Sequence, residues 1–487
     1  MNVSNRRLTD EEFFNERKEV LAMWPTGKDV DLEEAIAYHK SMPRNKNFVY
    51  KLLDARQRGE IPLVSDMGYT TIELETELLQ YIQKHGQPDF LGHHVDSLTR
   101  NLRFAEAEKQ VRKAEATGEN LLNGFPVVIH GVSGNRKLTE SVDLPVRLRF
   151  VSPTGRLTTE IALAGGNTSA EGQQMLCFMN YTGRDERPET VIREFQYISR
   201  LIGYYEEHGV PILVHVVGGN HLSNMTPPSL QLALSIIDLL MLPEQGVVHP
   251  YVGMASAGNL AQDVAYAIAC RTLGNEYLKK LGYDNVLLMT GGAEIPGRYP
   301  LDHAQSFTEV IWSPLVSTLA DVDLCHIKTL DEADTIPTKE NNATSLRGAR
   351  MMLNLLKDQK LDIRDNKDVI AETKMIEMET RAILDKVLEL GDGDPVTGTI
   401  KALEFGVLDH PMSNNKHVQA RVMGVRDTKG AVRYLECGNL PFPKEVVEFH
   451  RDKLAERERK IGKAVDFDIV IADFLAISTG SLLPDLK

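Results

Sequence analysis

Residues 144–181 read LPVRLRFVSPTGRLTTEIALAGGNTSAEGQQMLCFMNY and hold the pattern that decides the fold. An apolar strand delivers Arg149, a glycine-flanked loop delivers Glu171, and Tyr181 follows. Arg147 and Arg149 lie on one side of that strand because side chains alternate along it. A buried arginine needs a carboxylate partner or a carboxylate ligand, so an internal ion pair and a ligand pocket are both open. The stretch predicts a polar pocket at the end of a barrel.

Outward from this stretch, short apolar runs alternate with helical segments of about ten to twenty residues, the βα pattern of a parallel sheet. The helical segments at 73–86, 189–209, 229–241 and 259–282 carry apolar residues at three-to-four spacing. Nine strands are predicted, so one exceeds the eight of a barrel: 62–67, 89–95, 126–132, 146–152, 174–180, 211–217, 247–253, 285–291 and 322–328.

These repeats favour an α/β fold, a (β/α)8 TIM barrel, over an open doubly wound sheet. No GxGxxG follows any strand, which removes the main reason to expect a dinucleotide-binding sheet. Residues 1–60 predict an N-terminal helical arm, with capping-box spacing from Thr9 to Glu12. Residues 61–345 predict the barrel, and 346–487 a C-terminal α+β extension packed on it, because no Gly/Ser/Pro-rich linker intervenes.

The composition is that of a globular protein, with 42% hydrophobic and 25% charged residues in a chain of 487. A formal charge of −14 argues against a nucleic-acid or anionic-membrane surface. The N-terminus lacks an apolar leader, and the most apolar run, 230–242, is too short to span a bilayer and carries Asp238. We therefore expect a cytoplasmic protein.

Cysteine and histidine spacing predicts no metal bound directly by this chain. His93 and His94 are adjacent and point to opposite sides of a strand, so they do not share a metal. Four cysteines lie far apart without a CxxC pair and predict reduced thiols: Cys177, Cys270, Cys325 and Cys437.

Chemistry in such barrels sits at the C-terminal ends of the strands. Two arginines, a lysine and a glutamate meet there and predict a pocket for a small anionic molecule. Each also has a plainer reading, as a salt-bridge partner, a helix cap or a solvated charge run. The strand-end positions are Asp66, Gly68, Arg100, Asn123, Arg149, Tyr181, residues 218–221, residues 256–259, Lys328 and Glu332.

Many separated segments, all in one order, resemble the large (epsilon) subunit of glutamate mutase, also called methylaspartate mutase, over nearly the full length. They include TDEEF, EVLAMWPTGKDVDLEEA, AGGNTSAEG, GYYEEHGV, NEYLKKLGY, KTLDEADTIPTKE and VRYLECGNLPF. The resemblance implies an adenosylcobalamin-dependent radical rearrangement that interconverts L-glutamate and threo-3-methyl-L-aspartate. The barrel is then the substrate-bearing half, and the cofactor supplies the hard chemistry.

The resemblance also implies roles for individual residues. Arg100 and Arg149 become substrate-carboxylate clamps, Glu171 holds the substrate amino group and serves as its base, and Tyr181 hydrogen-bonds the substrate. Further substrate-facing positions are Asp66, Phe150 and Cys177. The cofactor-facing positions are Gly68, Asn123, Asn180, Tyr299, Lys328, Glu332 and Ile336, with Lys328 and Glu332 on the adenosine ribose.

Four of these positions depart from the family pattern. Asp66 replaces a clamp arginine and Phe150 replaces a histidine. Cys177 replaces a tyrosine, and Asn180 replaces a proline. A carboxylate in place of a guanidinium reverses the local charge, so a dianionic ligand loses an ion pair and meets repulsion. One alternative is therefore the same chemistry on a neutral or basic amino acid. Another, from a different class, is a non-catalytic barrel that binds a partner or ligand.

The resemblance implies a partner as well. None of the 14 histidines has an aspartate two residues before it, so the cobalamin-binding signature Asp-x-His-x-x-Gly is absent. A separate small subunit carrying that motif is then expected to hold most of the adenosylcobalamin. The family implies a heterotetramer of two large and two small subunits.

Overall fold

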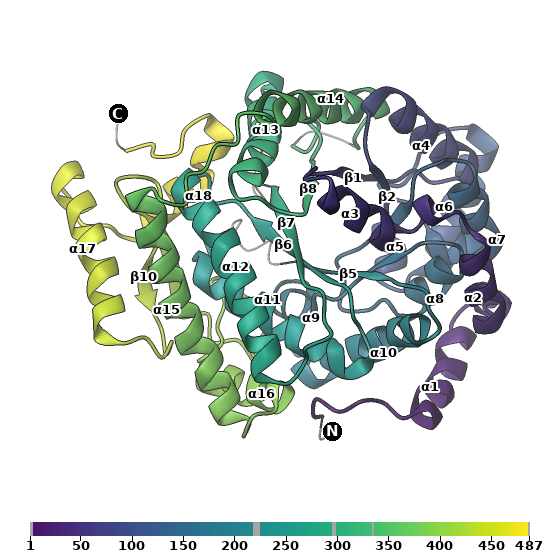
Figure 1. The fold of residues 1–487 in the computed structure, drawn as a ribbon, viewed down its shortest axis with the longest axis horizontal. Coiled ribbons are helices and arrows are strands. Elements are labelled where there is room, and N and C mark those ends of the chain that lie inside the picture. Colours follow the sequence, from purple (N-terminus) through teal and green to yellow (C-terminus); the bar gives the residue numbers. More distant parts are fainter. Residues whose placement is uncertain (1–2, 218–224, 295–298, 334–335, 486–487) are drawn as a thin grey trace.

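The centre of the fold is a ring of parallel strands. The structure, a computed structural model, describes residues 3–217, 225–294, 299–333 and 336–485. Its strands hydrogen-bond in the order β3-β2-β1-β8-β7-β6-β5-β4, and helices surround them (Figure 1). The strands are β1 (Leu63–Met67), β2 (Phe90–His94), β3 (Val146–Arg149), β4 (Ser169–Glu171), β5 (Leu213–Val217), β6 (Pro250–Ala255), β7 (Met289–Glu294) and β8 (Leu324–His326). The predicted (β/α)8 barrel is confirmed.

The four helices predicted from apolar spacing are confirmed as α4, α10, α11 and α12. α4 begins after Thr71, whose side chain accepts a hydrogen bond from the Leu74 amide, and Gln87 ends it in the left-handed region. α14 packs between α13 and α4 and completes the ring. The helices between the strands are α4 (Ile72–Gly86), α5 (Ser97–Arg100), α6 (Phe104–Thr117), α7 (Val127–Glu140), α8 (Arg156–Ala164), α9 (Gln174–Tyr181), α10 (Pro188–Glu207), α11 (Pro228–Met241), α12 (Leu260–Lys280), α13 (His303–Leu319) and α14 (Lys339–Leu356).

Three segments near the deciding stretch differ from the prediction. Residues 126–132 and 174–180, predicted as strands, belong to α7 and α9, and the fourth strand is β4, inside the segment predicted as a loop. Both runs are short, apolar and largely buried, and periodicity alone does not separate a buried helix from a strand in such runs. A distant contact fixes α9, because the Asp238 carboxylate on α11 accepts hydrogen bonds from the Met175 amide at 3.1 and 3.2 Å.

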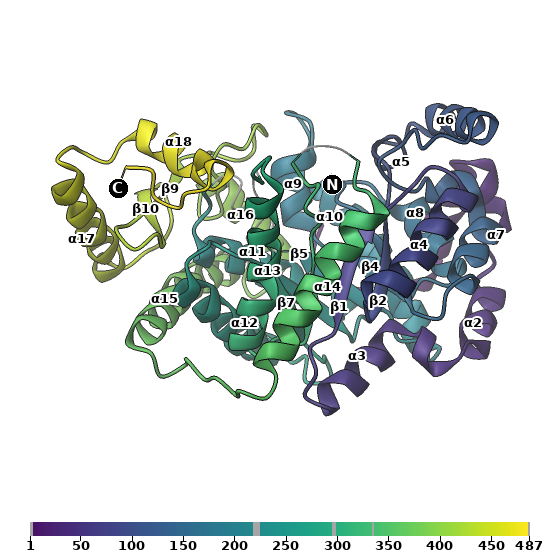
Figure 2. The ribbon, with the colours of Figure 1, turned by 90° about the horizontal axis from the view of Figure 1, so that it is seen from above.

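The N-terminal helices pack on the barrel, and one of them closes its lower end. They are α1 (Asp10–Ala22), with the predicted capping box between Thr9 and Glu12, α2 (Leu32–Ser41) and α3 (Phe48–Gln57). Phe48 of α3 stacks on Phe90 of β2 with ring centroids 3.8 Å apart, inside a buried cluster drawn from six strands. Figure 2 shows α3 at the opposite end of the barrel from α5 and α9. A plugged lower end leaves the upper end for a site.

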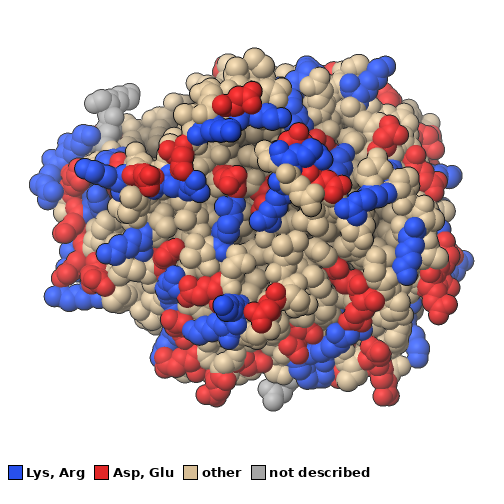
Figure 3. All heavy atoms as spheres, in the orientation of Figure 1, with Lys and Arg blue, Asp and Glu red and all other residues tan. Residues whose placement is uncertain are grey.

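The C-terminal part lies beside the barrel, at the left of Figure 1. Its elements are α15 (Lys367–Leu390), α16 (Pro395–Phe405), the antiparallel pair β9 (Val422–Arg426) and β10 (Val432–Cys437), α17 (Lys444–Ile461) and α18 (Phe467–Ala476). α15 packs along α11 and α12, and a buried ion pair between Arg457 and Asp473 joins α17 to α18 at 2.6 Å. Basic and acidic side chains are interspersed over the face in Figure 3. No helix of the described residues is long and apolar enough to cross a membrane.

Candidate functional site

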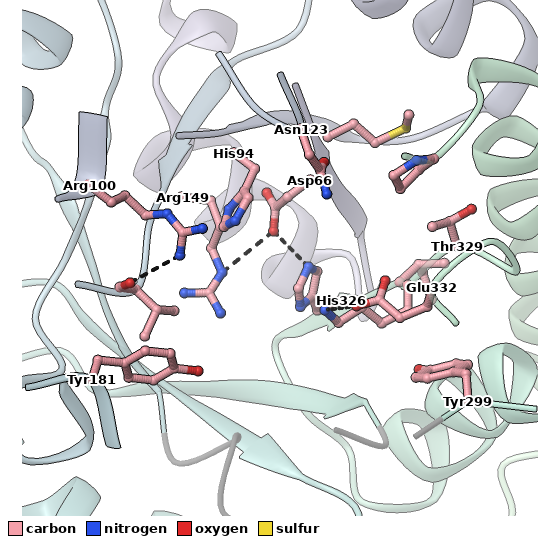
Figure 4. Close-up of a pocket in the computed structure, with 15 residues that line it drawn as sticks. Asp66, His94, Arg100, Asn123, Arg149, Tyr181, Tyr299, His326, Thr329 and Glu332 are labelled. Atoms are coloured by element: carbon pink, nitrogen blue, oxygen red, sulfur yellow. Dashed lines mark hydrogen bonds and ion pairs between the residues drawn. The ribbon is translucent and has the colours of Figure 1, made fainter. Parts of the chain in front are cut away.

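A cavity of about 350 Å³ opens at the C-terminal ends of the strands. Eight predicted site residues line it: Asp66, Arg100, Asn123, Arg149, Tyr181, Tyr299, Lys328 and Glu332. Figure 4 shows the arginines and Tyr181 on one side, and Tyr299 and Glu332 on the other. These eight positions, some predicted to face the substrate and others the cofactor, therefore share one cavity.

Glycines inside the barrel make room for charged side chains. Asp66, Gly92 and Arg147 form one register row across β1, β2 and β3, and a Cβ on Gly92 would lie 2.0 Å from the Asp66 carboxylate. In β6, a Cβ on Gly253 would lie 2.6 Å from the imidazole of His215. Above the apolar layer next to α3, the interior thus carries carboxylates, guanidiniums and imidazoles in place of aliphatic side chains.

Asp66 is the centre of the first ionic group. Arg147 donates from Nε to Asp66 Oδ1 at 2.7 Å and from Nη2 to Oδ2, and His326 Nε2 lies 2.7 Å from Oδ2. Arg149 Nε lies 3.8 Å from the same oxygen. Burial alone would raise the pKa of Asp66, but Arg147 and His326 hold it well below its usual value. Asp66 is therefore ionised, and its charge is already matched inside the protein.

Glu171 is the centre of the second ionic group. Arg149 donates from Nη1 to Glu171 Oε2 at 2.9 Å, and His215 Nδ1 lies 3.5 Å from Oε1. Oε1 is buried and has no hydrogen-bond partner within the described part of the chain. Burial raises the pKa of Glu171, but the Arg149 guanidinium outweighs burial, and the pKa lies below its usual value. Burial lowers the pKa of His215 to about 4, so this imidazole is neutral at pH 7.

Arg100 reaches the cavity from α5, whose first amides are capped by the Asp96 carboxylate at 2.9 and 3.0 Å. Its Nη1 donates to the carbonyl of Val151 at 3.2 Å (Figure 4). Burial lowers the pKa of Arg100, and its Nε has no hydrogen-bond partner among the residues described. A partly desolvated guanidinium without a counter-ion is a receptor for a carboxylate.

The far side of the cavity carries the predicted cofactor-facing residues. Lys328 Nζ lies 2.9 Å from Glu332 Oε1, and both side chains are partly exposed. Tyr299 is 5% exposed, whereas Asn123 is exposed at the rim. This side offers a charged pair, an amide and an aromatic ring.

Six other predicted positions lie outside the lining of the cavity. One of them is Glu171, which is fully buried and is paired with the lining residue Arg149. Phe150 is buried against Gly155, and Cys177 is enclosed in α9, where burial raises the pKa of its thiol well above the usual value. Asn180 donates to the carbonyl of Leu176. The remaining two are Gly68, whose carbonyl accepts from the Gly124 amide, and Ile336, which is half-buried next to the lining residue Pro337.

The remaining predictions from the sequence concern two strand-end loops and the four cysteines. Residues 218–221 lie outside the described residues. In the loop 256–259, Asn259 caps α12 and Ser256 bonds Asp263, so this loop has a structural role. All four cysteines are free, and the described residues hold no group of three or more His, Cys, Asp or Glu arranged for a metal ion.

The sequence predicted no role for His94, His215 or His326. It indicated Arg147 only as lying on the same side of its strand as Arg149. All four occupy inward positions of strands, at the same parity as Asp66 or Arg149. Burial, together with the charges of Arg100 and Arg149, lowers the pKa of His94 to about 3. The detectable signal was polar residues at inward positions of otherwise apolar strands, beside glycines in neighbouring strands.

Comparison with known proteins identifies the family of this chain. The Methylaspartate mutase E chain family matches residues 42–485. The chain belongs to this family. Similar relatives include the glutamate mutase epsilon subunits of Desulfitobacterium hafniense, 40% identical over 483 residues, and of Treponema denticola, 38% identical. Each match covers 99% of both chains. The epsilon subunit of Haloarcula marismortui is 35% identical over 99% of this chain and 96% of its own length. The resemblance to the methylaspartate mutase E chain family is therefore confirmed.

Proposed function

We propose that this chain is the large subunit of an adenosylcobalamin-dependent carbon-skeleton mutase acting on L-glutamate, to give threo-3-methyl-L-aspartate, or on a related small amino acid. The observation that carries the proposal is a cavity lined by Arg100 and Arg149, with the buried carboxylate of Glu171 paired to Arg149. Arg100 lacks a counter-ion and Glu171 Oε1 lacks a hydrogen-bond partner among the described residues. These two groups suit the carboxylate and the ammonium of an amino acid.

Adenosylcobalamin fits the residues on the far side of the cavity. Lys328 and Glu332 offer a donor and an acceptor for ribose hydroxyls, and Tyr299 and Asn123 offer an aromatic face and an amide for a nucleobase. When bound, the cofactor supplies a carbon-centred radical. The predicted neighbours Gly68, Asn180 and Ile336 remain proposals for the same role.

The side chains of this protein would bind and orient the substrate. Arg100 and Arg149 attract its carboxylate, and Tyr181 stands at the rim with 42% of its surface exposed. Glu171 is ionised at neutral pH because the Arg149 guanidinium lowers its pKa. In that form it accepts a hydrogen bond from an ammonium group and can take up a proton.

A partner completes the proposal. The sequence contains no Asp-x-His-x-x-Gly motif, and the relatives are named epsilon subunits, which fits a separate small cobalamin-binding subunit. We propose a cytoplasmic heterotetramer of two large and two small subunits.

The decisive experiment mixes the purified chain with a small subunit that carries the motif and with adenosylcobalamin, and then adds single amino acids. Rearranged product in the proton NMR spectrum, with an electron paramagnetic resonance signal that depends on substrate, supports the mutase. Absence of both signals with every amino acid would leave the non-catalytic binding barrel as the better description. A Glu171→Gln variant is the matched inactive control.

A further inference from the structure

We infer that the cavity selects a monocarboxylic amino acid with an uncharged side chain, and that Asp66 is the residue that sets this specificity. The inference rests on the proposed function, because it names the substrate class of the same site. It depends on how many cationic groups of the described cavity remain available to a ligand.

Most cations around the cavity are already matched. Arg147 is committed to Asp66 by two hydrogen bonds, Arg149 to Glu171, and Lys328 to Glu332. Arg100 forms no ion pair with any described residue, and among these residues it donates only to a backbone carbonyl. The described groups therefore provide for one ligand carboxylate.

One candidate group for the ligand ammonium is Glu171, which does not line the cavity itself but is paired with the lining residue Arg149. Glu171 uses Oε2 for Arg149, while Oε1 is buried and faces the neutral imidazole of His215 at 3.5 Å. One uncommitted buried carboxylate oxygen suits one ammonium group. A single α-carboxylate and a single α-ammonium thus satisfy both open receptors.

Asp66 then decides what the rest of the ligand carries. It lines the cavity and is ionised, with three donor contacts from Arg147 and His326. A second carboxylate near it would find no uncommitted described cation and would be repelled by a buried like charge. A cationic side chain would instead approach the guanidiniums that surround Asp66, including Arg149 at 3.8 Å. An uncharged side chain avoids both costs, and Met67, Val151 and Ile327 offer it apolar surface.

The test measures binding to the full chain by isothermal titration calorimetry with L-glutamine, L-glutamate and L-ornithine as probes. Glutamine and glutamate differ only in the charge of the side chain, so their ratio isolates the effect of Asp66. We expect glutamine to bind on the order of 10- to 100-fold tighter than glutamate or ornithine. Equal or tighter binding of glutamate, or no binding of glutamine, overturns the inference.

Variants locate the cause. Asp66→Asn leaves the Arg147 charge uncompensated, so it should reduce the preference for glutamine at least about tenfold. Asp89→Asn removes the carboxylate of an Arg–Asp pair outside the cavity, with Arg350, and should leave the preference unchanged. An unchanged preference in Asp66→Asn contradicts the assignment to this residue. The ratio of glutamine to glutamate binding is measured on the wild type, so it does not depend on whether any variant folds. The binding experiment uses neither cofactor nor partner, so its result is independent of the turnover experiment. Rearrangement of glutamate would support the mutase and refute only the inference about specificity.

Discussion

Arg149 Nη1 donates to Glu171 Oε2 at 2.9 Å across the β3–β4 junction. β3 and β4 are the two ends of the hydrogen-bonded strand order, so side chains join the described barrel where its main-chain ladder stops. Gln173 Nε2 adds a second bridge, to the carbonyl of Phe150 at 2.8 Å. The proposed amino-acid receptor is thus built on the seam of the barrel, and its ion pair also joins the two end strands.

Glu171→Gln should lower stability as well as activity. Removing the charge leaves the buried Arg149 without its nearest counter-ion, and breaking such a pair costs about 3 kcal/mol. Urea denaturation measures the loss. Glu404→Gln, on an exposed surface, is the control and should change stability by less than about 0.5 kcal/mol. Equal stability of Glu171→Gln and wild type would mean that this pair contributes nothing to folding.

The loss of folding stability at low pH should depend on Asp66. The pKa values of Asp66 and Glu171 are lowered in the folded state, whereas the unfolded chain takes up these protons near pH 4. Their stabilising contribution is complete above the unfolded pKa values and is lost as the pH falls toward the folded ones. Urea midpoints should therefore drop steeply below about pH 4 in the wild type, and less steeply in Asp66→Asn. Parallel curves would argue against this linkage.

Glu75 should show the opposite dependence. Burial raises its pKa to about 8, and the amide of Tyr69 donates to Oε2 at 2.7 Å. Because the folded pKa exceeds the unfolded one, the contribution of Glu75 is complete below about pH 4 and is lost as the pH rises toward 8. Glu75→Gln should therefore stabilise the protein by about 2 kcal/mol at pH 8, with a smaller gain at pH 5. Thermal unfolding at both pH values checks this, and a gain independent of pH contradicts it.

Asp238 should act on α9 as a neutral acceptor. Burial raises its pKa well above the usual value, and its two oxygens accept from the Met175 amide. Asp238→Ala removes this cap and should cost about 1–2 kcal/mol in urea denaturation. Asp238→Asn keeps an uncharged acceptor and should remain close to wild type. If the Asn variant were as unstable as the Ala variant, the charge and not the hydrogen bond would be what α9 requires.

The plug at the lower end of the barrel should be essential for stability. Phe48 is fully buried and stacks on Phe90, so Phe48→Ala leaves a cavity and should cost about 3–5 kcal/mol. Phe405→Ala removes a ring that is 57% exposed and should cost far less. Chemical denaturation of both variants tests the contrast. Similar losses would show that α3 does not anchor the barrel.

The sequence by itself determined the architecture and the family of this protein. Apolar spacing marks α4, α10, α11 and α12 because helix periodicity is a local property that a buried stripe imposes on every turn. The stretch 144–181 also predicted that Arg149 and Glu171, which are 22 residues apart, lie close together. The prediction of strands at the short apolar runs 126–132 and 174–180 was wrong. Both runs are buried in helices, and a contact from a distant carboxylate, not the local pattern, fixes α9.

Only the tertiary structure decided which charges remain open to a ligand. Asp66 meets Arg147 across 81 residues of sequence, and Arg147 approaches His326 across 179. No local pattern reports such pairings, because they arise when strands from distant parts of the chain turn the same parity inward around one axis. Burial then raises or lowers each pKa according to the neighbours that the barrel supplies. For this reason Arg100 Nε and Glu171 Oε1 have no hydrogen-bond partner among the described residues, while the charge of Asp66 is matched from within.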